Sequence, residues 1–409
     1  MAAGAAGRGT DDAAAAAAAA DGSAKSAAAV IRNFRRCIGL PNVYRCADTD
    51  RLADRLGEQG ERDVGERVLL HDAGLIVDLR SDSERDSDRA MRWTSLAPGG
   101  GFDVVAGGNS DFPAGGDGGQ ERNPGQIRRR RRTVLRLDPL SPSSFAEYLD
   151  ENWLDGGLKV KAAMYKIVDG QKLHELRMDV LNERGLVGLY EAILETNTGR
   201  RDLFEALRAI TVHMEREREE LQQQLQRQRE GAGGAAAAPG SAATATNAVR
   251  PVVIHCVQGK DRTGLLVMLC QSILGVPDGE IVECYSRSEE AFPSRSSPST
   301  SSSSATVASA AADGGESGDG GNPGTGNEPA PKRGKLDRRV FSGAPPHVML
   351  KTLEWIRSRY GSVLGYLDDI GFDRSWRERF VAGFDADIAE SSLQQHEQQA
   401  VNRSFRSKL

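Results

Sequence analysis

The sequence lacks the features that mark secreted, metal-binding and membrane-spanning proteins. Its five cysteines, at positions 37, 46, 256, 270 and 284, form no CxxC pair and no metal-ligand spacing. No segment reaches the run of about 18 apolar residues that suggests a membrane span. We therefore expect no integral membrane segment and a reducing compartment, which is the cytoplasm or, with an import signal, the nucleus.

Neither acidic nor basic residues are in strong excess in this sequence. Segments expected to be ordered alternate with low-complexity segments. The net charge of −5 says little about partners, and we expect no nucleic-acid partner. An Ala- and Gly-rich tail (1–29), without the pattern of a signal peptide, and a polar tail (386–409) flank one expected domain over 30–385. Because loop closure costs little entropy, we interpret three biased stretches as insertions into this domain, near residues 93–126, 215–247 and 293–331.

The remaining sequence alternates between expected strands and expected helices. Short apolar runs predict strands over 76–79, 133–137 and 251–255. Apolar spacing predicts helices over 264–274 and 347–359, and a helical region that opens near Phe145 and continues through 158–209. This alternation predicts an α/β fold with a mostly parallel central sheet flanked by helices. Such sheets bind ligands at the carboxyl ends of their strands.

One ten-residue segment, His255 to Gly264 (HCVQGKDRTG), carries the functional signal. It joins a predicted strand to a predicted helix, and a helix N-terminus behind a tight loop binds anions through converging backbone N–H groups. Cys256 opens the loop, and Arg262 ends it with a planar fork that suits two phosphate oxygens. The pattern predicts a cysteine-dependent phosphatase that uses no metal and no cofactor.

Each residue of this loop has an expected role. A free thiol is mostly protonated at neutral pH, so the helix N-terminus, the loop amides and Arg262 are expected to stabilise the Cys256 thiolate. The thiolate attacks phosphorus to form a phosphocysteine, while Arg262 and the amides hold the equatorial oxygens. We expect His255 to hold the loop backbone, Gly259 to permit its turn and Thr263 to donate to the sulfur. The expected phosphate-binding residues are Val257, Gln258, Gly259, Lys260, Thr263 and Gly264.

The segment resembles the signature loop of protein tyrosine phosphatases, and its GKDRTG ending is similar to the tyrosine/serine, or triple-specificity, family common in bacteria. Other segments resemble that family in order, with Cys46 where Ser is usual: NFR at 33–35, VYRC at 43–46, VDLRS at 77–81 with Glu84, and YGS at 360–362. The resemblance implies hydrolysis of phosphotyrosine, and of phosphoserine or phosphothreonine in addition.

The general acid is left open among several carboxylates. It must reach the mouth of the loop to protonate the leaving oxygen. Asp261 lies in the loop, and the family resemblance implies a role for it. Asp138 follows a predicted strand, as the acid does in related dual-specificity phosphatases, although an Asp before Pro139 is commonly a turn initiator. Asp78 and the nearby Asp82 are further candidates, and a buried Asp78 bonded to backbone is the ordinary alternative.

Two basic features bear on the substrate and the partners. Phosphoinositide phosphatases also carry Lys in their signature loops, so Lys260 makes a phosphoinositide the alternative to a phosphoprotein substrate; a solvated Lys or a pair with Asp261 is the ordinary reading. The run Arg128–Arg132 is either solvated loop charge or a contact for anionic lipid or an import factor. A non-catalytic phospho-binding or scaffold protein is less favoured, because Cys256 and Arg262 are both present.

Overall fold

The computed structural model describes residues 31–48, 72–86, 103–106, 132–231, 249–292, 334–337 and 339–384. Within these ranges a six-stranded sheet has the order β1-β2-β6-β3-β5-β4. All neighbouring strands run parallel except β1 and β2. The strands are β1 (Arg35–Arg36), β2 (Val43–Cys46), β3 (Leu75–Asp78), β4 (Asp103–Ala106), β5 (Thr133–Arg136) and β6 (Val252–His255).

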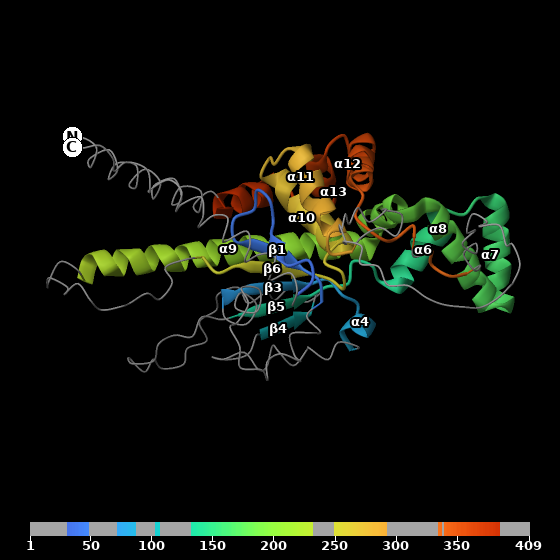
Figure 1. Ribbon diagram of the computed structural model, residues 1–409, viewed down its shortest axis with the longest axis horizontal. Helices are drawn as coiled ribbons and strands as arrows, with labels where there is room; N and C mark the ends of the chain where they lie inside the picture. The colour runs from blue at the N-terminus through green and yellow to red at the C-terminus, as the bar shows by residue number, and fades with distance from the viewer. Residues whose placement is uncertain are drawn as a thin grey trace, which may run out of the picture.

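Helices surround this sheet, so the predicted α/β fold with a mostly parallel sheet is confirmed. In Figure 1, α9 runs along the sheet, α10 to α13 gather above it, and α6 to α8 lie beyond one end. The helices are α4 (Asp82–Asp86), α6 (Pro142–Asn152), α7 (Gly156–Val168), α8 (Gly170–Glu195), α9 (Asn197–Gly231), α10 (Asp261–Ile273), α11 (Asp278–Ser286), α12 (Pro346–Tyr360) and α13 (Val363–Asp369), with the short 3-10 helix η3 (Arg287–Glu289).

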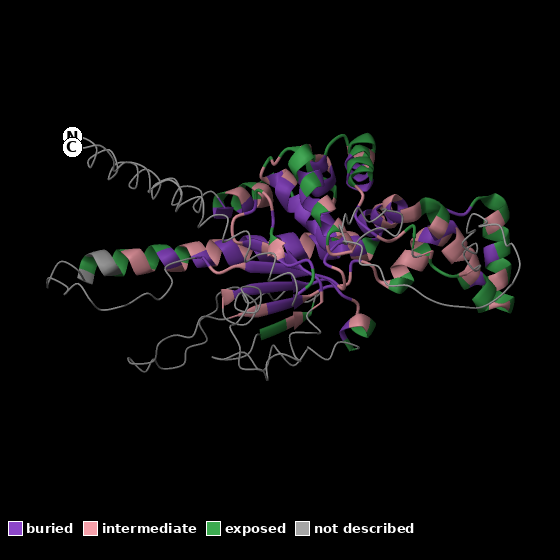
Figure 2. Ribbon diagram, viewed as in Figure 1, coloured by how far each residue is buried: buried purple, intermediate pink, exposed green. Residues whose placement is uncertain are grey.

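The core lies on both faces of the two central strands. Every residue of β3 and of β6 is buried, and α10 is buried along nearly its whole length (Figure 2). Parallel strands that are covered on both faces have continuous rather than alternating apolar sequences, which explains the LIV and VVI runs. Because these strands run parallel to β5, their carboxyl ends meet at one edge, where Asp78 pairs in register with both His255 and Arg136.

A second, smaller apolar cluster lies among α6, α7 and α8, which we call the α6–α8 lobe. Its buried residues include Leu149, Trp153, Leu154, Leu173 and Leu181. No helix in the described part of the chain is long and apolar enough to cross a membrane.

The structure differs from the sequence expectations at a few boundaries. Residues 103–106, inside the first expected insertion, form β4 and pair with β5, so this part of 93–126 belongs to the sheet. Residues 215–231, at the start of the second expected insertion, form the end of α9. Most of the first insertion, the end of the second, the third and both expected tails lie outside the described residues.

Candidate active site

The predicted signature segment forms a loop between β6 and the N-terminus of α10. Cys256 follows β6 directly and is 2% exposed, whereas Asp261 and Arg262 lie in the first turn of α10. Gly259 has a φ of 61°, and a Cβ there would lie 1.9 Å from the backbone oxygen of Cys46. Glycine avoids both the strain and the collision, so the turn expected at Gly259 is present.

The carbonyl oxygens of this loop are held from outside by two side chains. Asn33 donates from Nδ2 to the oxygen of Gly259 at 2.8 Å and to that of Gln258 at 3.1 Å. Arg45, fully buried, donates to Gly259 at 2.7 Å and to Lys260 at 3.3 Å. In a trans peptide the following N–H points away from the carbonyl. These contacts therefore turn the loop amides toward the inside of the loop.

Arg262 is fixed by Glu84 and keeps two donors for another group. Its Nη1 donates to Glu84 at 2.6 Å and to the oxygen of Leu79 at 3.0 Å, and its Nη2 donates to Glu84 at 2.8 Å. Of the five guanidinium N–H groups, Nε–H and the second Nη2–H have no partner in the described part of the chain. Those two lie on one side of the planar group and form a fork of the kind that binds two phosphate oxygens.

The pKa values of Arg262 and Glu84 are shifted in the directions that keep both side chains charged. Burial by itself would lower the pKa of Arg262, but the hydrogen bonds to Glu84 and the charge of Cys256 raise it above its usual value. Burial would raise the pKa of Glu84, but hydrogen bonding to Arg262 lowers it. The pair is therefore charged on both sides at neutral pH. Neither Asn33, Arg45 nor Glu84 was assigned a role from the sequence, although each lies in a segment that resembles the family.

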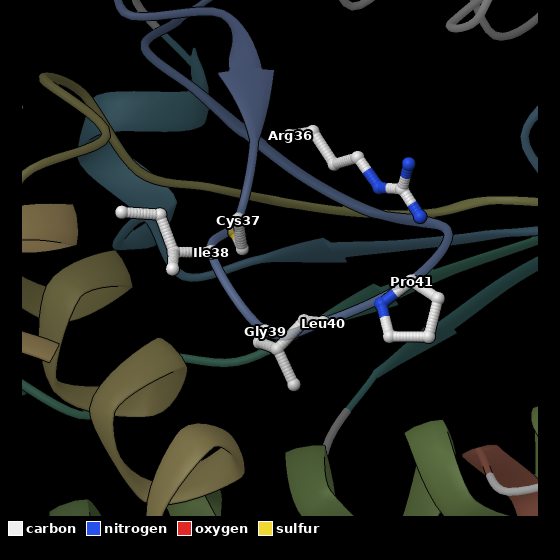
Figure 3. A pocket seen from close by; sticks show the side chains of 6 residues that line it. All are labelled: Arg36, Cys37, Ile38, Gly39, Leu40 and Pro41. Carbon is white, nitrogen blue, oxygen red and sulfur yellow. The ribbon is translucent and has the colours of Figure 1, made fainter. Parts of the chain in front are cut away.

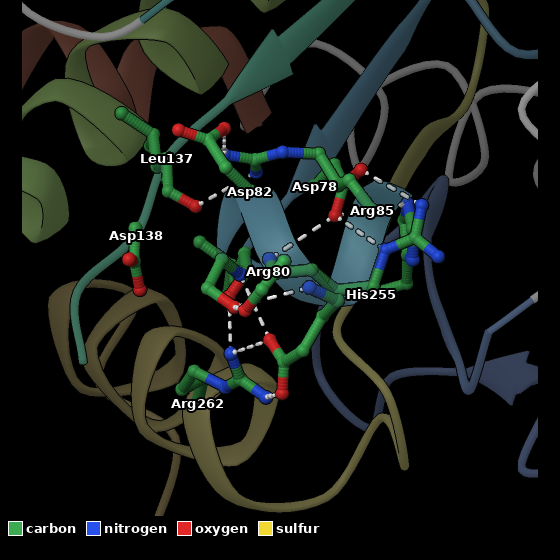
Figure 4. Close-up of polar contacts among 12 residues, drawn as sticks. Asp78, Arg80, Asp82, Arg85, Leu137, Asp138, His255 and Arg262 are labelled. Carbon is green, nitrogen blue, oxygen red and sulfur yellow. Dashed lines mark hydrogen bonds and ion pairs between the residues drawn. The ribbon is translucent and has the colours of Figure 1, made fainter. Parts of the chain in front are cut away.

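Asp78 is a buried anion that cannot supply a proton at neutral pH. It accepts hydrogen bonds from Arg80 Nε and Nη2, both at 2.9 Å, and its Oδ1 lies 3.8 Å from His255 Nε2 (Figure 4). Burial acts to raise its pKa, but the charge of His255 and the bonds to Arg80 lower it to about 2. The neighbouring Asp82 is exposed and pairs with Arg85, which lowers its pKa. The contacts of Asp78 and Asp82 favour the charged form of both carboxylates and so do not favour either as the general acid.

The ammonium of Lys260 is bound inside the protein, which does not favour the expectation that this cation meets a substrate phosphate. Its side chain is fully buried, and Nζ donates to the backbone oxygens of Phe341 at 3.0 Å and Gly343 at 2.6 Å. It also lies 3.3 Å from Asp261 Oδ1, which was the ordinary alternative. A buried ammonium needs several acceptors to offset its lost hydration, and these three groups supply them.

The side chain of Asp261 also takes part in a hydrogen bond and an ion pair within the protein. Its Oδ1 accepts a hydrogen bond from the hydroxyl of Tyr190 at 2.7 Å, and that hydroxyl lies 2.8 Å from the hydroxyl of Tyr285. The side chain is 22% exposed. One oxygen of Asp261, Oδ1, thus connects the loop to Lys260 and to Tyr190 of α8.

Asp138 has the environment that a proton donor needs. It follows β5 at the same sheet edge, and its Oδ1 is buried with no hydrogen-bond partner in the described part of the chain (Figure 4). Burial raises the pKa of Asp138, while the charge of Arg262 and a hydrogen bond from the Leu140 backbone act in the opposite direction. The bond to Leu140 is the turn contact expected before a proline. Its own backbone N–H donates to Asp202 at 2.8 Å.

The remaining predicted loop residues have defined positions. The Thr263 hydroxyl is buried and has no hydrogen-bond partner within the described ranges, so a bond to the Cys256 sulfur is not formed here. The oxygen of Val257 accepts from the N–H of Asp48. Gly264 packs against the ring of Tyr285, which lies 3.2 Å from where a Cβ would stand.

Two further features of the described residues lack comparable chemistry. Within the described ranges, no group of three or more His, Cys, Asp or Glu side chains could hold a metal ion. A pocket lined by residues 36–41 lies in the turn between β1 and β2 (Figure 3). That turn precedes β2 and so lies at the opposite end of the parallel strands from Cys256. It contains no acid–base pair.

The comparisons with known proteins agree with this geometry. The profile of the tyrosine phosphatase family matches residues 41–384, which include the sheet from β2 onward, the loop and α10. A search among curated proteins found no match to the chain.

Proposed function

The chain belongs to the tyrosine phosphatase family, and from that premise we propose that it hydrolyses phosphotyrosine in proteins through a phosphocysteine on Cys256. Phosphoserine and phosphothreonine are further substrates in this proposal. The observation that carries it is the pair of N–H groups on Arg262 that remains unpartnered in the described part of the chain, beside Cys256 at the N-terminus of α10. A dianionic phosphate is the ligand that such a fork and a helix N-terminus favour.

The first step transfers the phosphoryl group to sulfur. The thiolate of Cys256 attacks phosphorus, the sulfur–phosphorus bond forms, and the bond to the substrate oxygen breaks. The loop amides and the Arg262 fork bind the equatorial oxygens as negative charge spreads over them. Glu84 acts as a positioning residue, because its two oxygens hold the guanidinium in one orientation.

We propose Asp138 as the general acid. A carboxyl group with a raised pKa keeps its proton closer to neutral pH, as protonation of a leaving oxygen requires. Its buried Oδ1 has no competing hydrogen bond within the described residues, whereas the Oδ1 of Asp261 is bonded to Tyr190. In the second step the resulting Asp138 carboxylate accepts a proton from the water that attacks phosphorus, so phosphate leaves and the thiolate is restored.

The loop itself gives no support for the phosphoinositide alternative. That alternative rested on a cation at position 260 facing a ring phosphate, and the ammonium of Lys260 is bound to Phe341 and Gly343 instead. We expect Lys260→Met to lower turnover of an aryl phosphate and of a phosphoinositide by the same factor, since it loosens the loop rather than removing a substrate contact. A larger loss on the phosphoinositide would reverse this argument.

Turnover of para-nitrophenyl phosphate in metal-free buffer tests the proposal. Cys256→Ser is expected to lower kcat by about 10⁴-fold or more, as removal of a nucleophile does. Cys270→Ser is the matched control, because Cys270 is equally buried on α10 but lies in the apolar core. Turnover that survives in Cys256→Ser, or that needs an added metal ion, would contradict the proposal. Phosphotyrosine and phosphoserine peptides then rank the substrates.

A further inference from the structure

The α7 helix exposes an apolar surface that no other described helix matches. Its Val160, Met164, Ile167 and Val168 are 72%, 54%, 88% and 77% exposed, and they are the four most exposed large apolar side chains in the described part of the chain. Single exposed apolar residues are ordinary on protein surfaces, but a contiguous set marks an interaction site.

These four side chains lie on one face of α7. Their spacing of four, three and one residues corresponds to a single helical face. The opposite face packs on the α6–α8 lobe through Ala162, which is buried, and through Leu158 and Tyr165, which are partly buried. The helix is therefore anchored by one face while its apolar outer face has no partner among the described residues.

Positive charge lies on both sides of the exposed apolar face, but at unequal distances from it. At 100° per residue, Lys161 falls beside Val168 at one edge, whereas Lys159 and Lys166 fall about 80° and 100° beyond Ile167 on the other side. The Nζ of Lys159 donates to the backbone oxygen of Glu151 at 2.8 Å. All three lysines are exposed, and α7 contains no Asp or Glu. The acidic residues at its ends serve as caps, since Asp155 accepts from the N–H of Leu158 and Asp169 from that of Lys172.

We propose that α7 docks the protein on an anionic phospholipid membrane. Its apolar face enters the boundary between headgroups and acyl chains, and its lysines extend to the lipid phosphates. The charge pattern favours this occupant over a protein, because protein interfaces are depleted in lysine and enriched in aromatic residues. The apolar face of α7 has Lys161 at one edge, Lys159 and Lys166 lie further round the helix, and the helix has no exposed aromatic ring.

The location of α7 gives this contact a consequence for the candidate active site. The α6–α8 lobe lies beyond the end of the sheet at which α4 follows β3, the end at which Cys256 also follows its strand (Figure 1). The lobe is joined to the loop, because Tyr190 of α8 donates to Asp261. A membrane bound to α7 therefore lies on the active-site end of the molecule.

Sedimentation of the full chain with lipid vesicles tests the docking surface. We compare vesicles of phosphatidylcholine alone with vesicles that also contain phosphatidylserine. The wild-type chain is expected to partition onto the anionic vesicles, and Ile167→Ser/Val168→Ser to lower that partition at least about tenfold, since two apolar side chains no longer enter the lipid. The matched control is Leu350→Ser/Leu364→Ser, whose residues are 42% and 43% exposed on α12 and α13. It should bind like wild type.

A third variant separates α7 from the basic run Arg128–Arg132. Replacing Arg128 to Arg131 by Ser and Gly, with Arg132 kept because its Nε donates to the backbone oxygen of Ala73, removes cationic charge but leaves α7 intact. Binding should then persist with a loss smaller than that of the α7 variant. Three results would overturn the proposal: no binding to anionic vesicles, a loss confined to the Arg-run variant, and self-association or protein capture that depends on Ile167 and Val168 while vesicle binding does not. Because both residues are exposed, the variant should fold normally.

Discussion

The loop at Cys256 and the helix α7 use their side chains in opposite ways. In the loop region even charged side chains are buried, and Arg45, Lys260 and Arg262 each donate to several acceptors. On α7, apolar side chains face outward and the lysines are exposed. Burial of charge is costly unless it is fully bonded. Exposure of a contiguous apolar face to water is also unfavourable, because apolar surface is more stable out of water.

Substitutions in the loop should therefore affect chemistry, and substitutions on the outer face of α7 should affect location. Loop residues are held by contacts from distant parts of the chain, so changes there alter the geometry of the phosphate site. The outer face of α7 contacts nothing in the described part of the chain, so changes there leave turnover of a small aryl phosphate intact. This distinction between the loop and α7 is wrong if loop variants keep full turnover of an aryl phosphate or if α7 variants lose that turnover.

Among the substitutions that keep the nucleophile Cys256, the largest effect is expected from Arg262→Lys. Lysine keeps the positive charge but cannot bind Glu84 and two phosphate oxygens at once, so kcat/KM for para-nitrophenyl phosphate should fall about 10³-fold. Arg85→Lys serves as the control, because Arg85 is also buried beside the site but bonds Asp82 and Leu137. A loss below tenfold in Arg262→Lys would show that its charge alone is needed.

Asp138→Asn is expected to lower turnover of aryl phosphates with poor leaving groups by about 10²-fold and to spare good leaving groups. The pKa of Asp138 is raised, so wild-type turnover of poor leaving groups should fall as the pH rises through that pKa. The variant should lose this pH dependence, because no proton remains to be lost. Asp261→Asn is the comparison. If it, rather than Asp138→Asn, shows the leaving-group effect, the assignment of the acid is wrong.

Gly259→Ala tests how tightly the loop backbone packs against β2. A Cβ at a positive φ costs about 1–2 kcal/mol in any setting. At Gly259 it also meets the Cys46 oxygen, which should add about 2 kcal/mol to the loss in free energy of unfolding. Gly275→Ala isolates the first cost, because Gly275 has a φ of 71° and nothing within 4 Å of a Cβ. Equal losses in denaturant titration would contradict the close approach.

The smallest effect is expected from Ile167→Ser. Its side chain is 88% exposed, so the free energy of unfolding should change by less than about 0.5 kcal/mol, and turnover of para-nitrophenyl phosphate should not change. Thermal unfolding and the same turnover measurement check both. A marked loss of stability would mean that Ile167 packs against the chain and is unavailable to a membrane.

The sequence predicted those parts of the fold and site that depend on local pattern. Continuous apolar runs located β3, β5 and β6, and the residue order of the signature segment placed Cys256 after a strand and Arg262 in the first turn of a helix. The short strands β1 and β2 carried no comparable apolar signal. The strand β4 is formed by Asp103–Ala106, inside a stretch whose Gly-rich composition suggested a loop.

The contacts missed from the sequence are those between distant segments. Lys260 was expected to face a substrate, but the oxygens that bind it lie 81 and 83 residues later in the chain. Glu84 lies 178 residues before Arg262. The choice among Asp78, Asp138 and Asp261 depended on burial and on neighbouring cations, which pattern alone does not determine. The segments that resemble the family pointed to Asn33, Arg45 and Glu84 but assigned them no role.

Trapping of the covalent intermediate would show whether Cys256 is the nucleophile. The full chain is mixed with an aryl phosphate in metal-free buffer, quenched with acid within the first turnover, and digested for mass spectrometry of the peptide that contains Cys256. We expect a phosphoryl group on the sulfur of Cys256 that is absent in Cys256→Ser and longer-lived in Asp138→Asn. A phosphoryl group on another residue, or its absence while the aryl product forms in a burst, would contradict the account.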